Sequence, residues 1–508
     1  MIDLTVAQIA AIVGGELADI SAHAAADLHV TGTVEFDSRK VTPGGLFLAL
    51  PGARSDGHDH AASAVAAGAV AVLGARPVGV PAVVVRPAGP DASAAQRADG
   101  GLAGVLEHDT DGSGAAVLAA LAKLATAVAA ELVAGWLTIV GITGSSGKTS
   151  TKDLLAAALE PLGEVVAPPG SFNNELGHPW TVLRATDSTD YLILELSARH
   201  PGNIAALAAI APPAIGVVLN VGTAHLGEFG SREAIAKTKA ELPQAVPRSG
   251  VVVLNVDDPA VAAMAEATAA RVVRVSRHSQ THAGPADVWA GPVTLDELAR
   301  PRFTLHSADS ADPMVEVRLA VHGDHQVSNA LCAAAVALEC GSRAEQVAKA
   351  LAGAGPVSQH RMRVSTRADG ITVIDDAYNA NPDSMRAGLQ ALAWISRSGG
   401  PGARRSWAVL GEMAELGEDA ISEHDRIGRL AVRLDVSRLV VVGLGRSMSA
   451  CTTARSWRAR GAQQLKRGPP SSPTPTPPWP CCGPNCGPGM WCWSRLPTPR
   501  AWGHSPIR

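Results

Sequence analysis

The segment best suited to bind a polyphosphate reads Gly144-Ser145-Ser146-Gly147-Lys148-Thr149-Ser150. It follows the apolar run 137–143 and precedes the helical segment 152–159. Glycines let backbone N–H groups approach phosphate oxygens, and the N-terminus of the following helix adds positive potential. We expect Lys148 to neutralise the β- and γ-phosphates and the Thr149 hydroxyl to ligate Mg²⁺. The spacing is GxxGKT rather than the longer GxxxxGK, and the alternative interpretation is a turn that caps a helix with an exposed lysine.

Two polar residues follow apolar runs that we expect to be strands beside this loop. Glu195 ends the run 191–195, and His225 follows the run 217–224. Because ligands gather at the carboxyl ends of the strands in an open parallel sheet, both side chains are expected near the phosphate loop. They are therefore candidate metal ligands. A lone glutamate at a strand end is more often a solvated side chain, so neither residue decides the question alone.

The elements that must position these residues repeat along the chain. A length of 508 residues is too great for one core, so about three domains are expected. Nearly continuous apolar runs alternate with helical segments, which predicts an α/β fold with parallel sheets covered by helices. We predict domains at 1–105, 106–320 and 321–450, followed by a tail at 451–508. The expected strands are 45–50 and 69–73 in the first domain, 137–142, 191–194, 215–220 and 251–255 in the second, and 371–374, 407–410 and 439–442 in the third.

Charge and composition exclude several classes of partner. The net charge of −4 does not favour a nucleic acid or an acidic membrane surface. The stretch 115–134 is the most membrane-like, but Lys123 and Glu131 interrupt it, which favours a core helix over membrane insertion. The first residues carry an acid and no basic region, unlike a signal peptide. Only Cys332 and Cys340 precede residue 450, which favours a reducing cytoplasm.

The segment 141–150, Gly-Ile-Thr-Gly-Ser-Ser-Gly-Lys-Thr-Ser, resembles the ATP loop of the Mur ligase family, and the resemblance extends from residue 1 to about 450. It implies an N-terminal UDP-binding domain, a central ATPase domain of the P-loop type and a C-terminal Rossmann-like domain. It also implies that Thr149, Glu195 and His225 bind Mg²⁺. The segment Ala236–Leu242 resembles the one whose lysine is carbamylated in that family; we match Lys239 to it, with Lys237 as the fallback. Two lysines on an exposed helix face are the alternative.

Further motifs in the third block resemble the nucleotide site of the family. The stretch 323–330 is similar to its GxHxxxN pattern, which implies that Asn329 contacts adenine, although Asp324 and Ser328 are also ordinary helix-capping types. The guanidinium of Arg361 is expected to contact the phosphates as a cation. Carboxylate, amide and aromatic groups follow the strand 371–374, and we assign them to the ribose and adenine site: Asp375, Tyr378 and Asn379.

Three stretches resemble the branch of the family that adds D-alanyl-D-alanine: 171–179, 376–385 and 410–417. The branch that adds diaminopimelate carries Asp-Asn-Pro-Arg, and no Asn-Pro-Arg occurs in this chain. By this resemblance Asn173, Asn174 and Glu175 lie near the muramoyl peptide. The segments 36–47 and 52–58 resemble the UDP-binding domain, which implies that Ser38 and Arg39 contact the uridine or its phosphates; a turn with a surface cation is the alternative.

The resemblance implies one reaction. UDP-N-acetylmuramoyl-tripeptide, D-alanyl-D-alanine and ATP would give the pentapeptide, ADP and phosphate through an acyl phosphate, with Mg²⁺ as cofactor and Lys148, His225 and Lys239 in catalytic roles. We expect a cytoplasmic monomer. The alternatives are another Mur-type ligase such as the diaminopimelate-adding one, a nucleotide-hydrolysing switch or phosphotransferase, and a ligase-like protein that is inactive because of its tail.

The tail departs from the family. From Arg446 to Arg508 there are nine basic residues and no Asp or Glu, and residues 451–508 hold five of the seven Cys and five of the ten Trp. Its proline-rich stretch cannot form a helix or an inner strand. Its cysteines lack the paired CxxC spacing of a zinc site. We interpret it as a disordered, frameshifted end, which predicts a third domain without its last elements.

Overall fold

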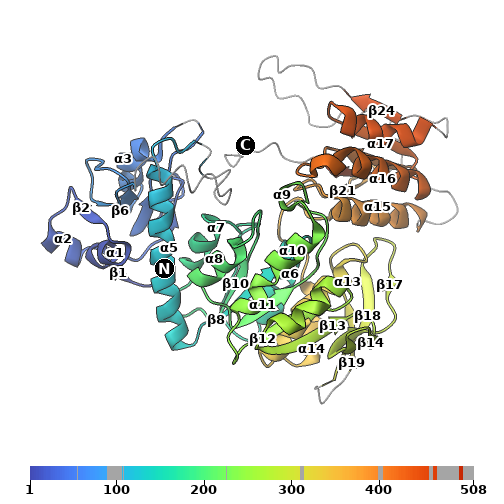
Figure 1. Ribbon diagram of the computed structural model, residues 1–508, viewed down its shortest axis with the longest axis horizontal. Coiled ribbons are helices and arrows are strands. Elements are labelled where there is room, and N and C mark those ends of the chain that lie inside the picture. Colours follow the sequence, from blue (N-terminus) through green and yellow to red (C-terminus); the bar gives the residue numbers. More distant parts are fainter. Residues whose placement is uncertain are drawn as a thin grey trace.

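The computed structural model describes residues 1–53, 55–87, 106, 108–224, 226–308, 314–398, 404–456, 462–465 and 491–495. Three α/β units follow one another along the chain, drawn blue, green to yellow, and orange in Figure 1. Each unit is built on its own sheet. The predicted α/β class and the three-domain arrangement are confirmed.

The first unit is a five-stranded sheet in the order β2-β7-β6-β5-β4, in which only the β2–β7 pair is antiparallel. Its strands are short apolar runs between turns, and the expected strands at 45–50 and 69–73 form β5 and β6. Helix α1 begins with a Thr5–Gln8 capping box and ends at Gly14, whose φ of 72° favours glycine. The elements are β1 Leu4–Thr5, α1 Val6–Val13, β2 Glu16–Ala18, α2 Ala22–Asp27, β3 His29–Val30, β4 Val34–Glu35, β5 Gly45–Leu48, α3 Ala61–Ala66, β6 Ala69–Gly74 and β7 Ala82–Val84.

Helix α5, Ser113–Gly135, joins the first unit to the second. By length and composition alone it is long and apolar enough to cross a membrane. Half of its apolar window is buried, and its buried face belongs to a core that runs from Ile2 in the first unit to Leu242 in the second. The helix packs against α1 on one side and against α7 and α8 of the second unit on the other. This is the packing of a core helix.

The second unit is a ten-stranded sheet. Strands β9, β10, β8, β11, β12, β13 and β16 are parallel, and β18, β17 and β19 extend the sheet in antiparallel pairs. All four strands that the sequence predicted here are present. The strands are β8 Thr138–Thr143, β9 Val165–Val166, β10 Tyr191–Glu195, β11 Ile215–Val218, β12 Val251–Asn255, β13 Arg271–Ser276, β16 Val288–Ala290, β17 Thr294–Leu295, β18 Pro301–Ser307 and β19 Met314–Arg318.

Helices cover this sheet on both faces. On one face α6 packs with α13 and α14 in a shared core. On the other face α7, α8 and α11 bury their apolar sides against β8 and β10. The helices are α6 Lys148–Leu159, α7 Gly177–Val182, α8 Asn203–Ile210, α9 Leu226–Phe229, α10 Arg232–Lys239, α11 Glu241–Ala245, α12 Pro259–Ala262, α13 Gln326–Glu339 and α14 Ala344–Gly353.

The position of α13 and α14 corrects the boundary that we predicted at residue 321. The core of the second unit extends to Ala354, so the third unit begins after it. We placed the boundary before this helix because the motif at 323–330 and the Ala-rich helix after it look like the start of a new α/β repeat. Helix α13 instead buries its small side chains against α6, where Ala and Val permit close helix contact.

The third unit has a six-stranded sheet in the order β20-β21-β25-β22-β23-β24. The strands expected at 371–374, 407–410 and 439–442 are β21, β22 and β23. Helices α15 and α16 pack on each other and α16 packs on α17. The elements are β20 Arg363–Thr366, β21 Thr372–Asp375, α15 Pro382–Arg397, β22 Ser406–Leu410, α16 Ala420–Arg433, β23 Arg438–Val442, α17 Arg446–Ser456, β24 Ala462–Leu465 and β25 Trp491–Arg495.

Strands β24 and β25 correct part of our interpretation of the tail. We expected no regular structure in 451–508, but β25 pairs in parallel with both β21 and β22, and β24 pairs with β23. The physical reason is that β21 and β22 are separated by the width of one strand, so their facing edges offer backbone hydrogen bonds to whichever segment enters the gap. The prediction for the remainder of the tail falls on segments outside the described residues.

Candidate active site

The ATP loop connects β8 to α6, and a neighbouring strand end fixes its shape. The Ser146 N–H donates to Asn220 Oδ1 (3.0 Å), and Asn220 Nδ2 donates to the Ser146 carbonyl (3.1 Å). The Ser145 N–H donates to the Asn220 carbonyl (3.1 Å). Sequence reasoning missed Asn220, although an amide that closes an apolar strand run was a usable signal. The Asn220 side chain therefore holds both the backbone N–H and the backbone carbonyl of Ser146.

Helix α13 lies directly against the loop at Gly147. Its φ is 85°, and a Cβ at this position would lie 2.5 Å from Asn329 Oδ1. Asn329 Nδ2 in turn donates to Gln326 Oε1 (2.9 Å). The structure therefore brings the predicted nucleotide residue Asn329 directly against the ATP loop, from an element some 180 residues further along the chain.

Lys148 is the first residue of α6 and is half-buried. Its Nζ donates to the Gly144 carbonyl across the loop (2.7 Å). Burial lowers the pKa of Lys148, the nearby Glu195 carboxylate raises it, and the Arg361 charge lowers it further. A cation held in such a site is poorly hydrated and gains by meeting phosphate oxygens.

Glu195 collects three donors on one oxygen. Thr149 Oγ1 (3.2 Å), Ser171 Oγ (3.3 Å) and Asn173 Nδ2 (3.4 Å) all donate to its Oε2. Its Oε1 is buried and has no hydrogen-bond partner among the described residues. Buried polar oxygens are seldom left unpaired, and a carboxylate oxygen beside a threonine hydroxyl suits Mg²⁺. The donor set therefore fits the predicted metal site.

Of the other two predicted metal ligands, His225 and Lys239, the structure describes Lys239. His225 lies outside the described residues. Lys239 ends α10 and is buried, whereas the fallback Lys237 is exposed on the same helix. Burial and the charge of Lys148 lower the pKa of Lys239 to about 7. An amine with this pKa is about half neutral at pH 7, and its neutral form is nucleophilic.

The third unit delivers Arg361 to the loop. Arg361 Nη2 donates to Thr149 Oγ1 (3.3 Å), and the guanidinium lies 3.9 Å from the centre of the Tyr378 ring. Its buried Nε has no partner among the described residues. The residues on either side, His360 and Met362, have φ values of 59° and 48°. Non-glycine residues in this left-handed region are strained and cluster at functional sites.

Two other predicted nucleotide residues lie around Arg361. Asp375 Oδ2 is 2.7 Å from His360 Nδ1, and the Tyr378 N–H donates to the His360 carbonyl (3.3 Å). Asn379 Oδ1 accepts the N–H of Ala380 (2.8 Å), so its side chain stabilises the turn before α15. Asp375 and Tyr378 thus support the segment that carries Arg361.

The segment 171–175 connects the Glu195 cluster to the first unit. Ser197 Oγ donates to the backbone carbonyl (2.8 Å) and Oδ1 (3.0 Å) of Asn173, and Asn174 Oδ1 accepts the N–H of Gly177 (2.9 Å). Burial raises the pKa of Glu175, and the charge of Arg199 opposes the shift. Asn173 therefore lies within the Glu195 cluster, and Glu175 is a half-buried carboxyl near it in the chain.

An aromatic cluster docks the first unit at this point. Phe172 lies 4.7 Å from Trp180 and 6.5 Å from Phe36, measured between ring centroids. Trp180 Nε1 donates to the Val34 carbonyl (2.7 Å). The predicted uridine residues Ser38 and Arg39 follow Phe36, and Arg39 is exposed and paired with Asp37 (2.8 Å). Sequence reasoning missed this cluster because it joins segments far apart in the chain.

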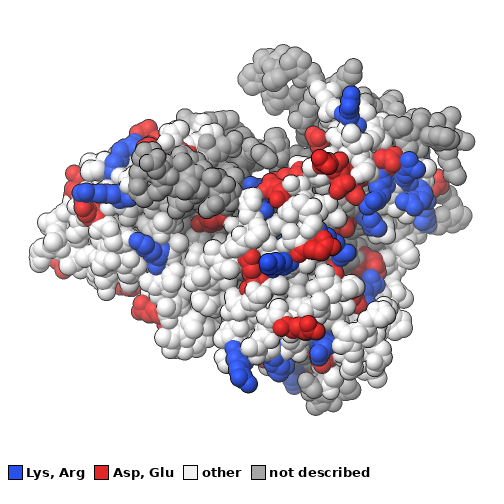
Figure 2. All heavy atoms as spheres, viewed as in Figure 1, with Lys and Arg blue, Asp and Glu red and all other residues white. Residues whose placement is uncertain are grey.

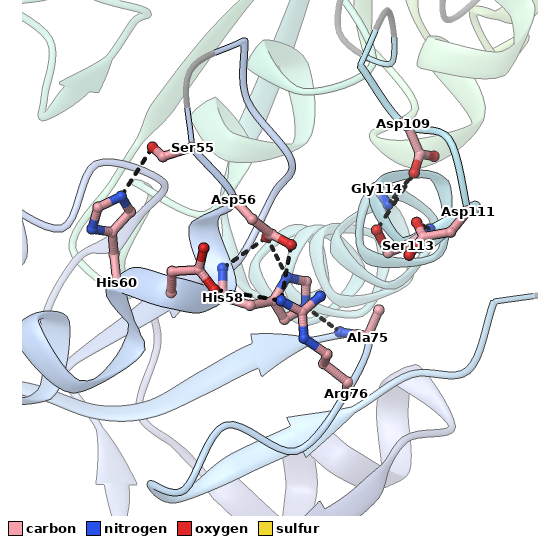
Figure 3. Close-up of polar contacts among 11 residues, drawn as sticks. Ser55, Asp56, His58, His60, Ala75, Arg76, Asp109, Asp111, Ser113 and Gly114 are labelled. Carbon is pink, nitrogen blue, oxygen red and sulfur yellow. Dashed lines mark hydrogen bonds and ion pairs between the residues drawn. The ribbon is translucent and has the colours of Figure 1, made fainter.

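A second polar group in the first unit is structural (Figure 3). The buried His58 places its Nδ1 2.7 Å from Asp56 Oδ1, while its Nε2 accepts the N–H of Ala75 (2.8 Å). Burial raises the pKa of Asp56, but hydrogen bonds from His58 and Arg76 outweigh it and hold the pKa at about 2. Both imidazole nitrogens are engaged, so His58 fixes the turn before α3 and is not placed to act as a base.

Charges of both signs are intermixed over the central and third units on the face drawn in Figure 2.

Comparisons with known proteins identify the family to which the chain belongs. The models "Mur ligase family, catalytic domain", "Mur ligase middle domain" and "Mur ligase, glutamate ligase domain" match residues 31–100, 142–337 and 360–468. The chain is 77% identical to the UDP-N-acetylmuramoyl-tripeptide--D-alanyl-D-alanine ligase of Mycobacterium leprae, over 89% of this chain and 88% of that protein.

This chain belongs to the Mur ligase family. It is also 79% identical to the ligase of the same name from Mycobacterium bovis, over 89% of this chain and 85% of that protein. Among solved structures, MurF from Acinetobacter baumannii superposes with a TM-score of 0.73 at 26% identity, covering 97% of this chain and 96% of that one. The middle-domain model includes most of α13, and the next model begins at residue 360, after α14.

Proposed function

We propose that this chain is an ATP-dependent ligase that joins D-alanyl-D-alanine to a UDP-N-acetylmuramoyl-tripeptide. The observation that carries the proposal is an identity of 77–79% with ligases of that name over 89% of this chain. The Mur ligase models that match 142–337 and 360–468 contain the ATP loop, the Glu195 cluster and the segments 171–179 and 376–385. The absence of Asn-Pro-Arg from the sequence argues against the diaminopimelate-adding alternative.

Each step of the reaction has a group to support it. Mg²⁺ bound with ATP would neutralise phosphate charge, held by Glu195 Oε1 and the Thr149 hydroxyl. Lys148 and Arg361 offset charge on the phosphoryl group as it leaves ADP, because both converge on the loop. A terminal carboxylate oxygen of the tripeptide attacks the γ-phosphorus, ADP departs, and an acyl phosphate results. The amine of the dipeptide then attacks the acyl carbon, loses its proton and expels phosphate.

We assign the carbamylated position to Lys239 rather than Lys237. Lys239 is buried beside Lys148 and its pKa is about 7, so it is the amine able to add CO₂ near neutral pH. A carbamate would give a metal-ligating oxygen and replace a costly buried cation by an anion between cations. We further assign Ser38 and Arg39 to the uridine end of the substrate, and we place the reaction in the cytoplasm.

The test is phosphate release from ATP with UDP-N-acetylmuramoyl-tripeptide and a panel of amines. We expect release with D-alanyl-D-alanine and only background release with meso-diaminopimelate, D-glutamate or L-alanine. Release that is equal with every amine, or independent of any amine, would refute the assignment. The second outcome would point to a nucleotide-hydrolysing switch.

A further inference from the structure

The third unit contacts the second beside the ATP loop, at the segment after β11. Asp383 Oδ2, at the start of α15, accepts the N–H of Thr223 (3.4 Å). A Cβ at Gly222 would lie 2.1 Å from that same oxygen, so the Asp383 side chain would have to leave this contact if Gly222 gained a side chain. The Gly222 N–H donates to Ser145 Oγ (2.9 Å), which links this contact to the ATP loop itself.

A second contact lies at α9, where two backbones meet without intervening side chains. A Cβ at Gly227 would lie 2.5 Å from the backbone nitrogen of Gly417, and one at Gly417 would lie 2.9 Å from the Gly227 Cα. The Gly227 N–H donates to the Glu415 carbonyl (3.1 Å). Gly417 also has a φ of 57°. Backbone atoms on both sides would have to move if either glycine gained a side chain.

Glu415 holds this contact with both its backbone and its side chain. Its φ of 61° is unfavourable for a residue with a side chain, and such strain persists only where the surroundings over-determine it. Its carboxylate lies 3.5 Å from Arg199 Nη2 of the second unit, and the two side chains are 17% and 38% exposed. Arg199 also acts on the Glu175 carboxyl, so it stands between carboxylates from two units.

We propose that Arg199 and Glu415 form an inter-domain latch that holds Arg361 against the ATP loop. Arg361 belongs to the third unit, and its reach to Thr149 depends on how that unit sits on the second. Glu415 is therefore a positioning residue that acts through Arg199, not a catalytic one. The inference rests on the proposed function only in that ATP binds at this loop.

A double-mutant cycle tests the latch, with the affinity for Mg²⁺–ADP measured by calorimetry. Arg199→Ala and Glu415→Gln should each weaken ADP binding about threefold to tenfold, and the double variant should be no weaker than the poorer single variant, because the two residues act as one unit. Affinity for UDP should stay unchanged. The charge-reversed pair, Arg199→Glu with Glu415→Arg, should bind ADP better than either reversed single variant. Glu418→Gln is the matched control, since Glu418 is exposed and no ion pair of it is described.

Additive losses in the cycle, or no recovery in the charge-reversed pair, would overturn the latch. In steady state the single variants should raise the KM for ATP more than they lower kcat; equal effects on every substrate would contradict a positioning role. Gly227→Ala should weaken ADP binding in the same way, whereas Gly353→Ala, with open space around its Cβ, should not. If ADP affinities couple but no amine is ligated, the latch stands and the proposed function fails.

Discussion

At the scale of single residues, the site depends on charged groups held away from water. Lys148 is half-buried and Lys239 is buried, and the charge of Lys148 lowers the pKa of Lys239. Glu195 has one oxygen saturated with donors and one without a partner among the described residues. Such an arrangement is costly in the absence of ligands and is offset when phosphate oxygens and a cation complete it.

Lys148→Ala should strongly slow phosphate release, because Arg361 donates to Thr149 and does not replace a charge at the γ-phosphate. We expect a loss of at least about a hundredfold in kcat at saturating ATP. Lys237→Ala, on an exposed face of α10, serves as the control and should retain wild-type turnover. Near-normal turnover of the Lys148 variant would remove the residue from the mechanism.

Lys239 should make stability depend on pH in a known direction. Its pKa is about 7 when folded and 10.5 in the unfolded chain, so between these values the unfolded state binds more protons and stability rises with pH. The free energy of unfolding is measured by urea titration from pH 7 to pH 9.5 in bicarbonate-free buffer. Lys239→Met should reduce its slope against pH by up to about 1.4 kcal/mol per pH unit. A slope identical to that of wild type would show that the amine is not buried in this way; Lys237→Met supplies the unaltered reference.

At the scale of elements, periodic apolar runs were sufficient to predict the strands that carry the site. Runs such as 191–194 and 215–220 are buried on both faces, and their nearly continuous apolar residues indicate that burial in the sequence. The clamp by Asn220 and the ring contacts of Phe36, Phe172 and Trp180 were not predictable in this way. They depend on which distant segments the topology brings together, and no local pattern records that.

The turn between β8 and α6 should tolerate no side chain at Gly147. Alanine at a φ of 85° is strained by about 1–2 kcal/mol, and its Cβ would meet Asn329 Oδ1. Gly147→Ala should weaken Mg²⁺–ADP binding by about tenfold or more. Gly135→Ala, at the end of α5 with nothing within 4 Å, is the matched control. Equal affinities in the two variants would mean that the loop is not shaped as described.

At the scale of the whole molecule, contacts between the three units set the surroundings of the ATP loop. The first unit docks through Trp180, the second supplies the ATP loop, and the third supplies Arg361. The sequence predicted residues for this site but placed the end of the second unit too early, because α13 looks like the start of a new repeat. Its small, buried face gives no sign of whether it covers the sheet before it or the one after it.

The part of the tail that should matter most for the third unit is β25. This strand pairs on both sides, with β21 and β22, so its removal would leave two facing edges unpaired. Truncation before residue 491 should make the third unit markedly more sensitive to limited proteolysis, while the first two units remain protected. Truncation after residue 495 should not. Equal protease resistance of the two truncated chains would show that β25 contributes nothing to the sheet.

The most direct test of the account follows oxygen atoms through the reaction. The chain is supplied with ATP, D-alanyl-D-alanine and UDP-N-acetylmuramoyl-tripeptide in which both oxygens of the terminal carboxylate are ¹⁸O. The masses of the products are then measured by mass spectrometry. Attack of that carboxylate on the γ-phosphate predicts one ¹⁸O in each released phosphate and the other in the new amide carbonyl of the pentapeptide. Unlabelled phosphate, or labelled tripeptide recovered without any dipeptide attached, would contradict carboxyl activation at the Lys148 loop.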